Sequence, residues 1–495
     1  MKLLRALWAG FIITTPLLGM WLGSSLASYL GGPRWVAIAG GVLLFPVLPL
    51  GWELWAQRRR SKANAERKAK GKEPKKAWLT TSDRLTLRTL FVNLSFLTTL
   101  VLAFPQQTFP ALSTRGAWFL DGETGDNVEL ARKVLFTAAE KLEWLYKLTH
   151  PNPYEGLGEG EDASKVKPDP RPDDKPDDKP DDTKRKPDAK KPNPDDTLPD
   201  VARKDPQAWP QSDKPHPLAT SVPATALTSI QSLGMHFKRA APDPVDRLRA
   251  MHDWVALNIT YDYAGIRDGS YNDKQGASRV FKTRTGVCSG YSNLMVALGK
   301  VTGDRILYIT GHTRGNDGQI QGSVGHAWNA VFVNGQWQLM DVTWDSPSAH
   351  GGKKPFPPLE STYFLPPPAV IGLDHFPDQP QWQLSSSPMS RGAFLRQPLV
   401  EPEFVAQGFN LVSPPTGRVD ADRVAKVRLF NPQKRHVIAQ VAPKGKTPKH
   451  CKVDARGKSV SIRCELGWTG RNIIQIFTST KTVGNHGYVG SVIVN

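Results

Sequence analysis

Three residues of types that act together in acyl transfer occur in the order Cys288, His326 and Asp341. A thiol becomes a strong nucleophile when a base takes its proton, and the base needs a partner that orients it. Taken alone, a cysteine in an apolar run is more often a buried hydrophobe, and a histidine on a strand is more often structural. An aspartate after a strand more often caps or turns the chain. The three together predict a Cys-His-Asp triad, provided that folding brings them into contact.

The sequence between His326 and Asp341 predicts a β-hairpin. Asn334-Gly335 between apolar runs is the strongest short signal for a two-residue type I′ turn, because both central residues need positive φ. Alternate side chains share a face, so His326 and Asp341 become diagonal neighbours, roughly 7–8 Å apart at the backbone. Counting outward from the turn gives the pairs Val333 with Gln336, Phe332 with Trp337, Trp328 with Asp341 and His326 with Thr343.

Cys288 lies where a helix is expected to begin. Gly286 and Gly290 bracket it, and apolar side chains follow at helical spacing, namely Tyr291, Leu294, Met295 and Leu298. The dipole at a helix N-terminus favours the thiolate form of a cysteine. The backbone amide of Cys288 is the expected oxyanion donor.

Three segments resemble the transglutaminase-like superfamily, in the branch that includes kyphoscoliosis-peptidase-type proteins. They are Thr285-Gly286-Val287-Cys288-Ser289-Gly290-Tyr291, Gly325-His326-Ala327-Trp328-Asn329 and Trp337-Gln338-Leu339-Met340-Asp341-Val342-Thr343-Trp344. Upstream, 251–255, 258–262 and 278–284 resemble the same family, so that the match covers about 225–346. The resemblance implies an α+β, papain-like core with a catalytic triad of Cys288, His326 and Asp341.

The resemblance leaves the reaction open, because the superfamily includes protein cross-linkers, peptidases, amidases and members without known activity. We expect an enzyme that cleaves amide bonds of protein or peptide substrates through a thioester, and passes the acyl group to water or to an amine. The alternative is a catalytically silent scaffold or binding protein of the cell envelope.

The first hundred residues predict a membrane region, 1–112. Uncharged apolar runs cover 6–30, 35–52 and 90–112, and about 20 apolar residues span a bilayer. We predict three transmembrane helices. The third run is interrupted by Pro105, Gln106 and Gln107, and its alternative is a buried or interfacial helix. The first run is too long, and too closely followed by the second, for a cleaved signal peptide.

A basic loop, 57–85, predicts the orientation. Between Arg58 and Lys76 it carries ten basic and two acidic residues, or +8 of the chain's formal +18. Basic loops stay in the cytoplasm, which places the N-terminus there and the chain after Leu112 on the extracytoplasmic (periplasmic or extracellular) side. If the third segment does not cross, the catalytic core is cytosolic instead. No basic–aromatic module accompanies the charge, so we expect no nucleic-acid partner.

An extracytoplasmic helical segment, 113–152, should contain an amphipathic helix near Asn127–Leu148 that packs either on the membrane or on the core. The following segment, 153–217, is poor in apolar residues and repeats Pro-Asp-Asp-Lys, which predicts a disordered linker. Its acidic residues lack the EF-hand pattern, so calcium is not expected.

The predicted catalytic domain, 218–400, contains a helix that begins at Asp243-Pro244 and runs through Ile259. Thr313–Ser323, rich in Gly and polar residues, is the candidate lid over Cys288. The proline-rich stretch 347–400 should wrap the core as loops. No Cys/His cluster has metal-ligand spacing, so we predict no metal and no cofactor.

Residues 401–495 predict a small β-sandwich-like domain that could bind an envelope protein partner or the substrate. The expected strands are Val424–Phe430, His436–Val441, Ser459–Cys464, Asn472–Phe477 and Tyr488–Val494. Counting outward from a Gly457-Lys458 turn places Cys451 opposite Cys464, about 4.5 Å apart at Cα, within disulfide range. A disulfide there indicates an oxidising compartment and leaves Cys288 as the free thiol.

Overall fold

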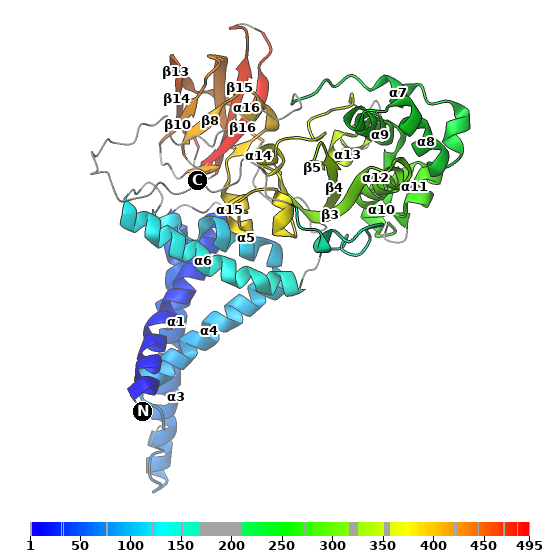
Figure 1. Ribbon diagram of the computed structural model, residues 1–495. Coiled ribbons are helices and arrows are strands. Elements are labelled where there is room, and N and C mark those ends of the chain that lie inside the picture. Colours follow the sequence, from blue (N-terminus) through cyan, green and yellow to red (C-terminus); the bar gives the residue numbers. More distant parts are fainter. Residues whose placement is uncertain are drawn as a thin grey trace, which may run out of the picture.

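The computed structural model describes residues 2–168 and 209–494 apart from short gaps, of which 316–324 and 351–356 are the longest. Most of the predicted linker (169–208) and most of the candidate lid (Thr313–Ser323) therefore lie outside the described residues. Figure 1 shows a helical region that extends away from two adjoining parts, a mixed α/β domain and a β-rich C-terminal region.

The helical region contains α1 (Lys2–Tyr29), α2 (Arg34–Val42), the π-helical turn η1 (Leu43–Val47), α3 (Leu48–Ala69), α4 (Thr81–Ala103), α5 (Pro105–Arg115) and α6 (Asp126–Thr149). Among the described residues, two helical stretches are long and apolar enough to cross a membrane, Trp8–Tyr29 and Arg34–Ala69.

Two predictions for this region are corrected. The third apolar run is not one helix, because α4 ends at Ala103 and α5 begins at Pro105, whose ring suits a first helical position. The basic stretch is not all loop either, since α3 continues as helix as far as Ala69.

Helix α6 forms at the predicted place and packs against α5 and against α15 (Arg391–Arg396), so it contacts both the helical region and the α/β domain. Arg396 of α15 links these elements. Its guanidinium donates to the carbonyl of Ser113 at 2.6 Å, lies 3.6 Å from Glu140 and stacks over Phe136 at 3.8 Å.

The α/β domain is built on an antiparallel sheet with the strand order β5-β4-β3-β6. The strands are β3 (Arg305–Thr313), β4 (His326–Val333), β5 (Gln336–Met340) and β6 (His375–Pro377). Helix α12 (Cys288–Thr302) packs against β3 and β4, while α8 (Ile230–Ala240) and α9 (Pro244–Asn258) pack against α12. Asp243 caps α9 as predicted, accepting from the backbone N–H of Asp246.

The predicted hairpin register is confirmed from Val333–Gln336 to Asn329–Met340. The strand then ends earlier than the count assumed. Asp341 caps a short helix, α13 (Val342–Asp345), so the expected pairing of His326 with Thr343 does not form. Asp341 still lies beside His326, because it is the first residue after the strand.

The stretch 347–400 is more ordered than predicted. It contains α14 (Pro368–Ile371), α15 and β6, and β6 extends the central sheet by pairing with β3 at 311–313. The loop interpretation is therefore wrong for this part, and β6 brings a histidine into the site.

Residues 152–168, of which composition assigned 153–168 to the linker, pack on the α/β domain, and we call this segment the strap. Tyr154, Ala163 and Val166 are buried. Asn152 donates from Nδ2 to the carbonyl of Gly311 at 2.8 Å, and Arg305 forms an ion pair with Glu161 at 2.6 Å. A linker that starts at 153 is thus contradicted, because apolar side chains here find a core to join.

The β-rich region has two sheets, with the orders β13-β14-β10-β8 and β12-β11-β15-β16-β7; β9 pairs with β16. The five predicted strands form as β10 (Val424–Phe430), β11 (His436–Ala442), β14 (Ser459–Glu465), β15 (Asn472–Ser479) and β16 (Gly487–Val494). The others are β7 (Leu399–Val400), β8 (Asn410–Ser413), β9 (Arg418–Val419), β12 (Lys449–His450) and β13 (Lys452–Arg456).

Both sheets contribute to one apolar core, with Val427 and Ile462 from the first and Val441 and Ile476 from the second. The predicted disulfide between Cys451 and Cys464 is present, with the Cα atoms 4.5 Å apart, and Cys288 is the free cysteine.

Candidate active site

Cys288 is the first residue of α12. The side chain of Gln275 holds the turn that precedes it. The Oε1 atom of this buried glutamine accepts from the backbone N–H of Val287 at 2.9 Å. A Cβ at Gly290 would lie 2.6 Å from the same oxygen, which is why a glycine suits this position in the first turn of the helix. Cys288 is only 1% exposed.

His326 opens β4 and points its ring toward Cys288 and Asp341. Its Nε2 lies 2.6 Å from Oδ2 of Asp341. The Cys288 side chain lies close enough to the ring to help raise the pKa of His326. Helix start, strand start and strand end thus bring together the three residues that the sequence singled out.

Asp341 is fully buried and is oriented by four N–H groups. Its Oδ1 accepts from the backbone of Thr343 at 2.8 Å and of Trp344 at 3.2 Å, as the cap of α13. Its Oδ2 accepts from His326 and from a second imidazole, His375, at 2.9 Å. This carboxylate cannot rotate without losing several of these bonds at once.

The electrostatics favour the charged forms of the His326–Asp341 pair. Burial alone would raise the pKa of Asp341, but the two neighbouring imidazoles hold it well below its usual range. Burial alone would lower the pKa of His326, but the charge of Asp341 and the contact with Cys288 raise it to about 10. The arrangement therefore favours a protonated imidazole at His326 beside an ionised carboxylate at Asp341.

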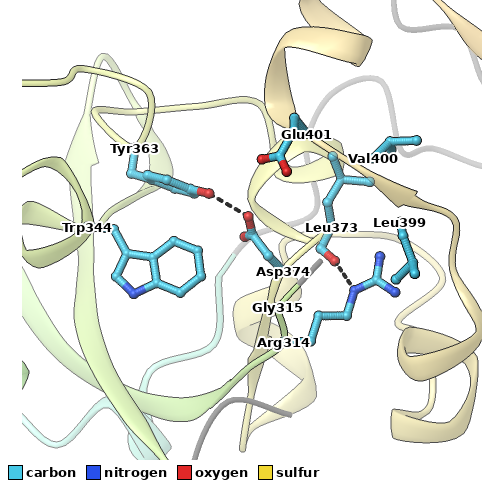
Figure 2. Close-up of a pocket in the computed structure, with 9 residues that line it drawn as sticks. All are labelled: Arg314, Gly315, Trp344, Tyr363, Leu373, Asp374, Leu399, Val400 and Glu401. Atoms are coloured by element: carbon cyan, nitrogen blue, oxygen red, sulfur yellow. Dashed lines mark hydrogen bonds between the residues drawn. The ribbon is translucent and has the colours of Figure 1, made fainter. Parts of the chain in front are cut away.

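His375 is the residue that the sequence gave no reason to select. It lies on β6, and its Nδ1 is 2.6 Å from Oδ1 of Asp374. Asp374 in turn accepts through Oδ2 from the hydroxyl of Tyr363, as Figure 2 shows. No local spacing links His375 to Asp341, because the contact spans two segments that meet only in the folded domain.

Three of these residues could also hold a metal ion. The ligand atoms of His326, Asp341 and His375 lie within 4.8 Å of one another, and imidazole with carboxylate is a donor set that suits zinc. Binding would require both imidazoles to give up the protons that now face Asp341. Sequence spacing, on which the expectation of no metal rested, could not show a group drawn from three separate strands and turns.

The strap closes the site above Cys288. Tyr154 is 2% exposed, and its side chain lies beside that of Cys288, close enough for the thiol to affect the pKa of Tyr154. Burial, with the nearby thiol, raises the pKa of Tyr154, so its hydroxyl stays protonated and able to donate. The carbonyl of Tyr154 accepts from Tyr308 at 2.9 Å, and Asn293 binds the strap at Leu157 and Glu159.

A small cavity, about 80 Å³, lies at the Asp374 end of the site rather than at Cys288. Figure 2 shows it between the α/β domain and the start of the β-rich region. Its lining consists of Arg314, Gly315, Trp344, Tyr363, Leu373, Asp374, Leu399, Val400 and Glu401. Space of this size has room for a few water molecules and is too small for a peptide.

The fold and the arrangement of Cys288, His326 and Asp341 are those expected for one class of protein. Residues 231–342 match the transglutaminase-like superfamily, and this part of the chain is a transglutaminase-like domain.

The chain is similar to human kyphoscoliosis peptidase (Homo sapiens), with 30% identity over 202 residues, which cover 39% of this chain and 30% of the relative. The mouse protein of the same name (Mus musculus) is 29% identical over 208 residues, covering 41% and 31%. The chain thus spans less than a third of the length of these relatives. A crystal structure of a TGase matches with a TM-score of 0.20 and 16% identity, covering 27% of this chain and 35% of that one.

Proposed function

We propose that the chain is a membrane-anchored, transglutaminase-like cysteine enzyme that acts on amide bonds of protein or peptide substrates. The observation that carries this proposal is the His326–Asp341 pair, with 2.6 Å between His326 Nε2 and Asp341 Oδ2, beside the buried thiol of Cys288, which is near enough to affect the pKa of His326. A thiol, a base and an orienting carboxylate in this order are the parts that thiol-based acyl transfer needs.

The proposed reaction has two halves. The Cys288 thiolate attacks the amide carbonyl carbon, the C–N bond breaks, and His326 gives its proton to the leaving amine, which leaves a thioester on Cys288. Water or a primary amine then attacks the thioester, His326 takes the proton of this nucleophile, and the thiolate leaves. Asp341 keeps the imidazole in one tautomer and stabilises its charged form throughout.

A membrane anchor is supported by the two apolar helical stretches, Trp8–Tyr29 and Arg34–Ala69. In Figure 1 the basic end of α3 lies far from the α/β domain, and α4 leads the chain back toward it. We propose that α4 is the third crossing, with the N-terminus and the basic end of α3 in the cytoplasm and the catalytic domain outside. The disulfide Cys451–Cys464 fits an oxidising compartment.

For the β-rich region we propose a sandwich-like recognition module that binds an envelope protein or aims the enzyme at its substrate. The support is its separate apolar core, which needs no residue of the site. Deleting 401–494 should change substrate choice more than it changes the reactivity of Cys288; equal effects on both would argue against this role.

The proposal is tested on the full chain in detergent by mass spectrometry after brief exposure to a small thiol reagent, methyl methanethiosulfonate, near neutral pH. Cys288 should be modified selectively, and His326→Ala should slow the reaction, because the base is gone. Amide donors with a fluorescent primary amine then distinguish transfer from hydrolysis, and Cys288→Ala should abolish either product without loss of the fold. Turnover that survives Cys288→Ala would exclude the mechanism.

A specific observation favours a second candidate, a silent scaffold or binding protein of the envelope. Cys288 is 1% exposed beneath Tyr154, so in this conformation no substrate reaches it. A scaffold predicts a thiol whose modification is slow and indifferent to His326→Ala. An enzyme predicts modification that depends on His326.

A further inference from the structure

The two sheets of the β-rich region differ in the charge that their strands carry. The strands β11, β15 and β16 of one sheet contain no Lys, Arg, Asp or Glu. The strands β10, β13 and β14 of the other sheet contain five basic and two acidic residues, and five minus two gives a net charge of +3. The basic residues are Lys426, Arg428, Lys452, Arg456 and Arg463, and the acidic ones are Asp454 and Glu465.

All five basic residues are exposed on the outer face of their sheet. On β10 and β14 they alternate with buried residues of the apolar core, such as Val427 and Ile462, so they point away from that core. On β13, Lys452 lies directly opposite Arg463, which places it and its alternate neighbours on the same face. In Figure 1 these three strands lie on the side of the β-rich region that is turned away from the α/β domain.

Three of these cations form a row that crosses the sheet. The register pairs Lys426 of β10 with Arg463 of β14, and Arg463 with Lys452 of β13. Directly opposite residues lie about 5 Å apart, and like charges in such positions destabilise a sheet. Within the part of the chain that the structure describes, none of the three side chains has an ion-pair or hydrogen-bond partner, and Asp454 is paired instead with Arg456 at 3.1 Å. The row therefore lowers stability without a compensating contact, which indicates a ligand that supplies negative charge.

The spacing of the cations along the strands favours an extended peptide as this ligand. Lys426 and Arg428 are two residues apart on β10, and Lys452 and Arg456 are four apart on β13. Alternate residues of an extended chain are about 6.6–6.8 Å apart. A peptide with acidic residues at alternate positions therefore repeats its carboxylates at the distance at which the sheet repeats its cations. Guanidinium groups suit such carboxylates because they can donate two parallel hydrogen bonds.

We propose that the outer face of β10, β13 and β14 binds an extended acidic segment of a protein, and that Lys426, Arg463 and Lys452 determine this specificity. The inference rests on the proposed function, because it names the ligand of the β-rich recognition module. Glu465, the last residue of β14, limits the face at one end. A protein with such a segment would be held by the β-rich region while another part of it enters the catalytic domain.

The experiment measures how a fluorescent peptide of alternating glutamate and serine binds to the full chain in a non-ionic detergent, by fluorescence anisotropy. A peptide of the same composition with its glutamates in one block should bind more weakly, because about half of its carboxylates point away from the face. Arg463→Gln should weaken binding of the alternating peptide about two- to fivefold, as expected for one exposed charge pair. Substitution of all three cations of the row by glutamine should weaken it about ten- to a hundredfold.

The matched control is Arg239→Gln, since Arg239 is an exposed arginine of α8 in the other domain, and it should leave binding unchanged. A second readout separates recognition from a structural role. Because Arg463 lies between two like charges, Arg463→Gln should leave the unfolding temperature unchanged or raise it while it weakens binding. A lower unfolding temperature with unchanged binding would overturn the proposal, and so would equal binding of the two peptides.

Other anionic ligands are tested on the same variants. Tighter binding of polyphosphate or of phosphatidylglycerol vesicles than of the alternating peptide, with the same dependence on Arg463, would overturn the proposal in favour of an anionic polymer or a membrane surface. Failure of the proposed function looks different, because His326→Ala would then leave the modification of Cys288 unaffected. Peptide binding needs no turnover, so the two failures are distinguishable.

Discussion

The domain contains two buried histidines that each lie between two carboxylates, and the comparison separates structure from function. The His375 cluster consists of His375, Asp341 and Asp374, and the His252 cluster consists of His252, Asp253 and Asp345. His252 lies 2.8 Å from Asp253 and 3.1 Å from Asp345, distances close to those around His375. The two clusters share residue types, burial and the raised pKa of the imidazole.

The two clusters differ in the further groups that their carboxylates contact. Asp253 binds Arg249 at 2.8 Å, and Asp345 accepts from the backbone of Tyr363 at 3.0 Å, so the His252 cluster ends in fixed groups. Asp341 accepts from His326 through Oδ2, and the thiol of Cys288 lies near that imidazole. A raised pKa of the imidazole therefore does not distinguish the two clusters, whereas the thiol near the His375 cluster makes that cluster the candidate for catalysis.

The largest expected effect comes from truncating His326, which accepts its orientation from Asp341 of the His375 cluster, and comparing it with truncation of His252. His326→Ala should lower turnover by about 100- to 10,000-fold, because the general base and acid is lost. His252→Ala should leave the reactivity of each folded molecule unchanged but lower the free energy of unfolding by about 3–5 kcal/mol, because two carboxylates stay buried without it. Turnover and urea denaturation on both variants measure this, and an equal loss of turnover in both would remove the distinction.

The cover of the nucleophile offers a smaller test. Tyr154→Ala should speed the modification of Cys288 by about tenfold, because a buried group reacts only after local opening. Tyr154→Phe keeps the ring and removes one hydroxyl, so it should remain close to the wild-type rate. Neither change should alter the contribution of the His252 cluster to stability. Equal rates for the alanine and phenylalanine variants would show that the ring does not close the site.

The smallest test uses acid, and the sign differs between the clusters. The lowered pKa of Asp341 means that its contribution to stability is present above its ordinary pKa and is lost as the pH falls toward the folded value. Burial raises the pKa of Asp345, so its contribution grows as the pH falls.

In Asp341→Asn, the decrease in the free energy of unfolding on acidification should therefore be smaller than in the wild type, by more than about 1.4 kcal/mol, the equivalent of one pKa unit. In Asp345→Asn, the same decrease in the free energy of unfolding should be larger than in the wild type or unchanged. Urea midpoints measured between about pH 5 and about pH 2 give both slopes. The reverse order of slopes would contradict the assignment of charge to the two carboxylates.

Local rules predicted much of this molecule because they act over a few residues. The Asn334-Gly335 turn set the register of β4 and β5, and the same count around Gly457-Lys458 set Cys451 against Cys464. Those counts also placed Asp341 near His326. Counting from the turn fails at the end of β5. There Asp341 caps α13, and the strand pairing stops before the last predicted pairs form.

Contacts between distant segments could not be predicted in this way. His375 reaches Asp341 across 34 positions, and Asn152 reaches Gly311 across 159. Composition also misled at the strap, whose glycines and acidic residues are those of a linker. Gly158 is nevertheless required by a close approach, since a Cβ there would lie 2.4 Å from the ring of Tyr308.

The strap makes the domain an intramolecular complex. Tyr154 belongs to the part of the chain before 169–208, and the thiol that it covers belongs to the part after it. A cut within 169–208 would leave two polypeptides, one of which carries a wall of the other's site. In the uncut chain the strap therefore acts as a tethered ligand of the site. The length of the tether sets the effective concentration at which the strap binds.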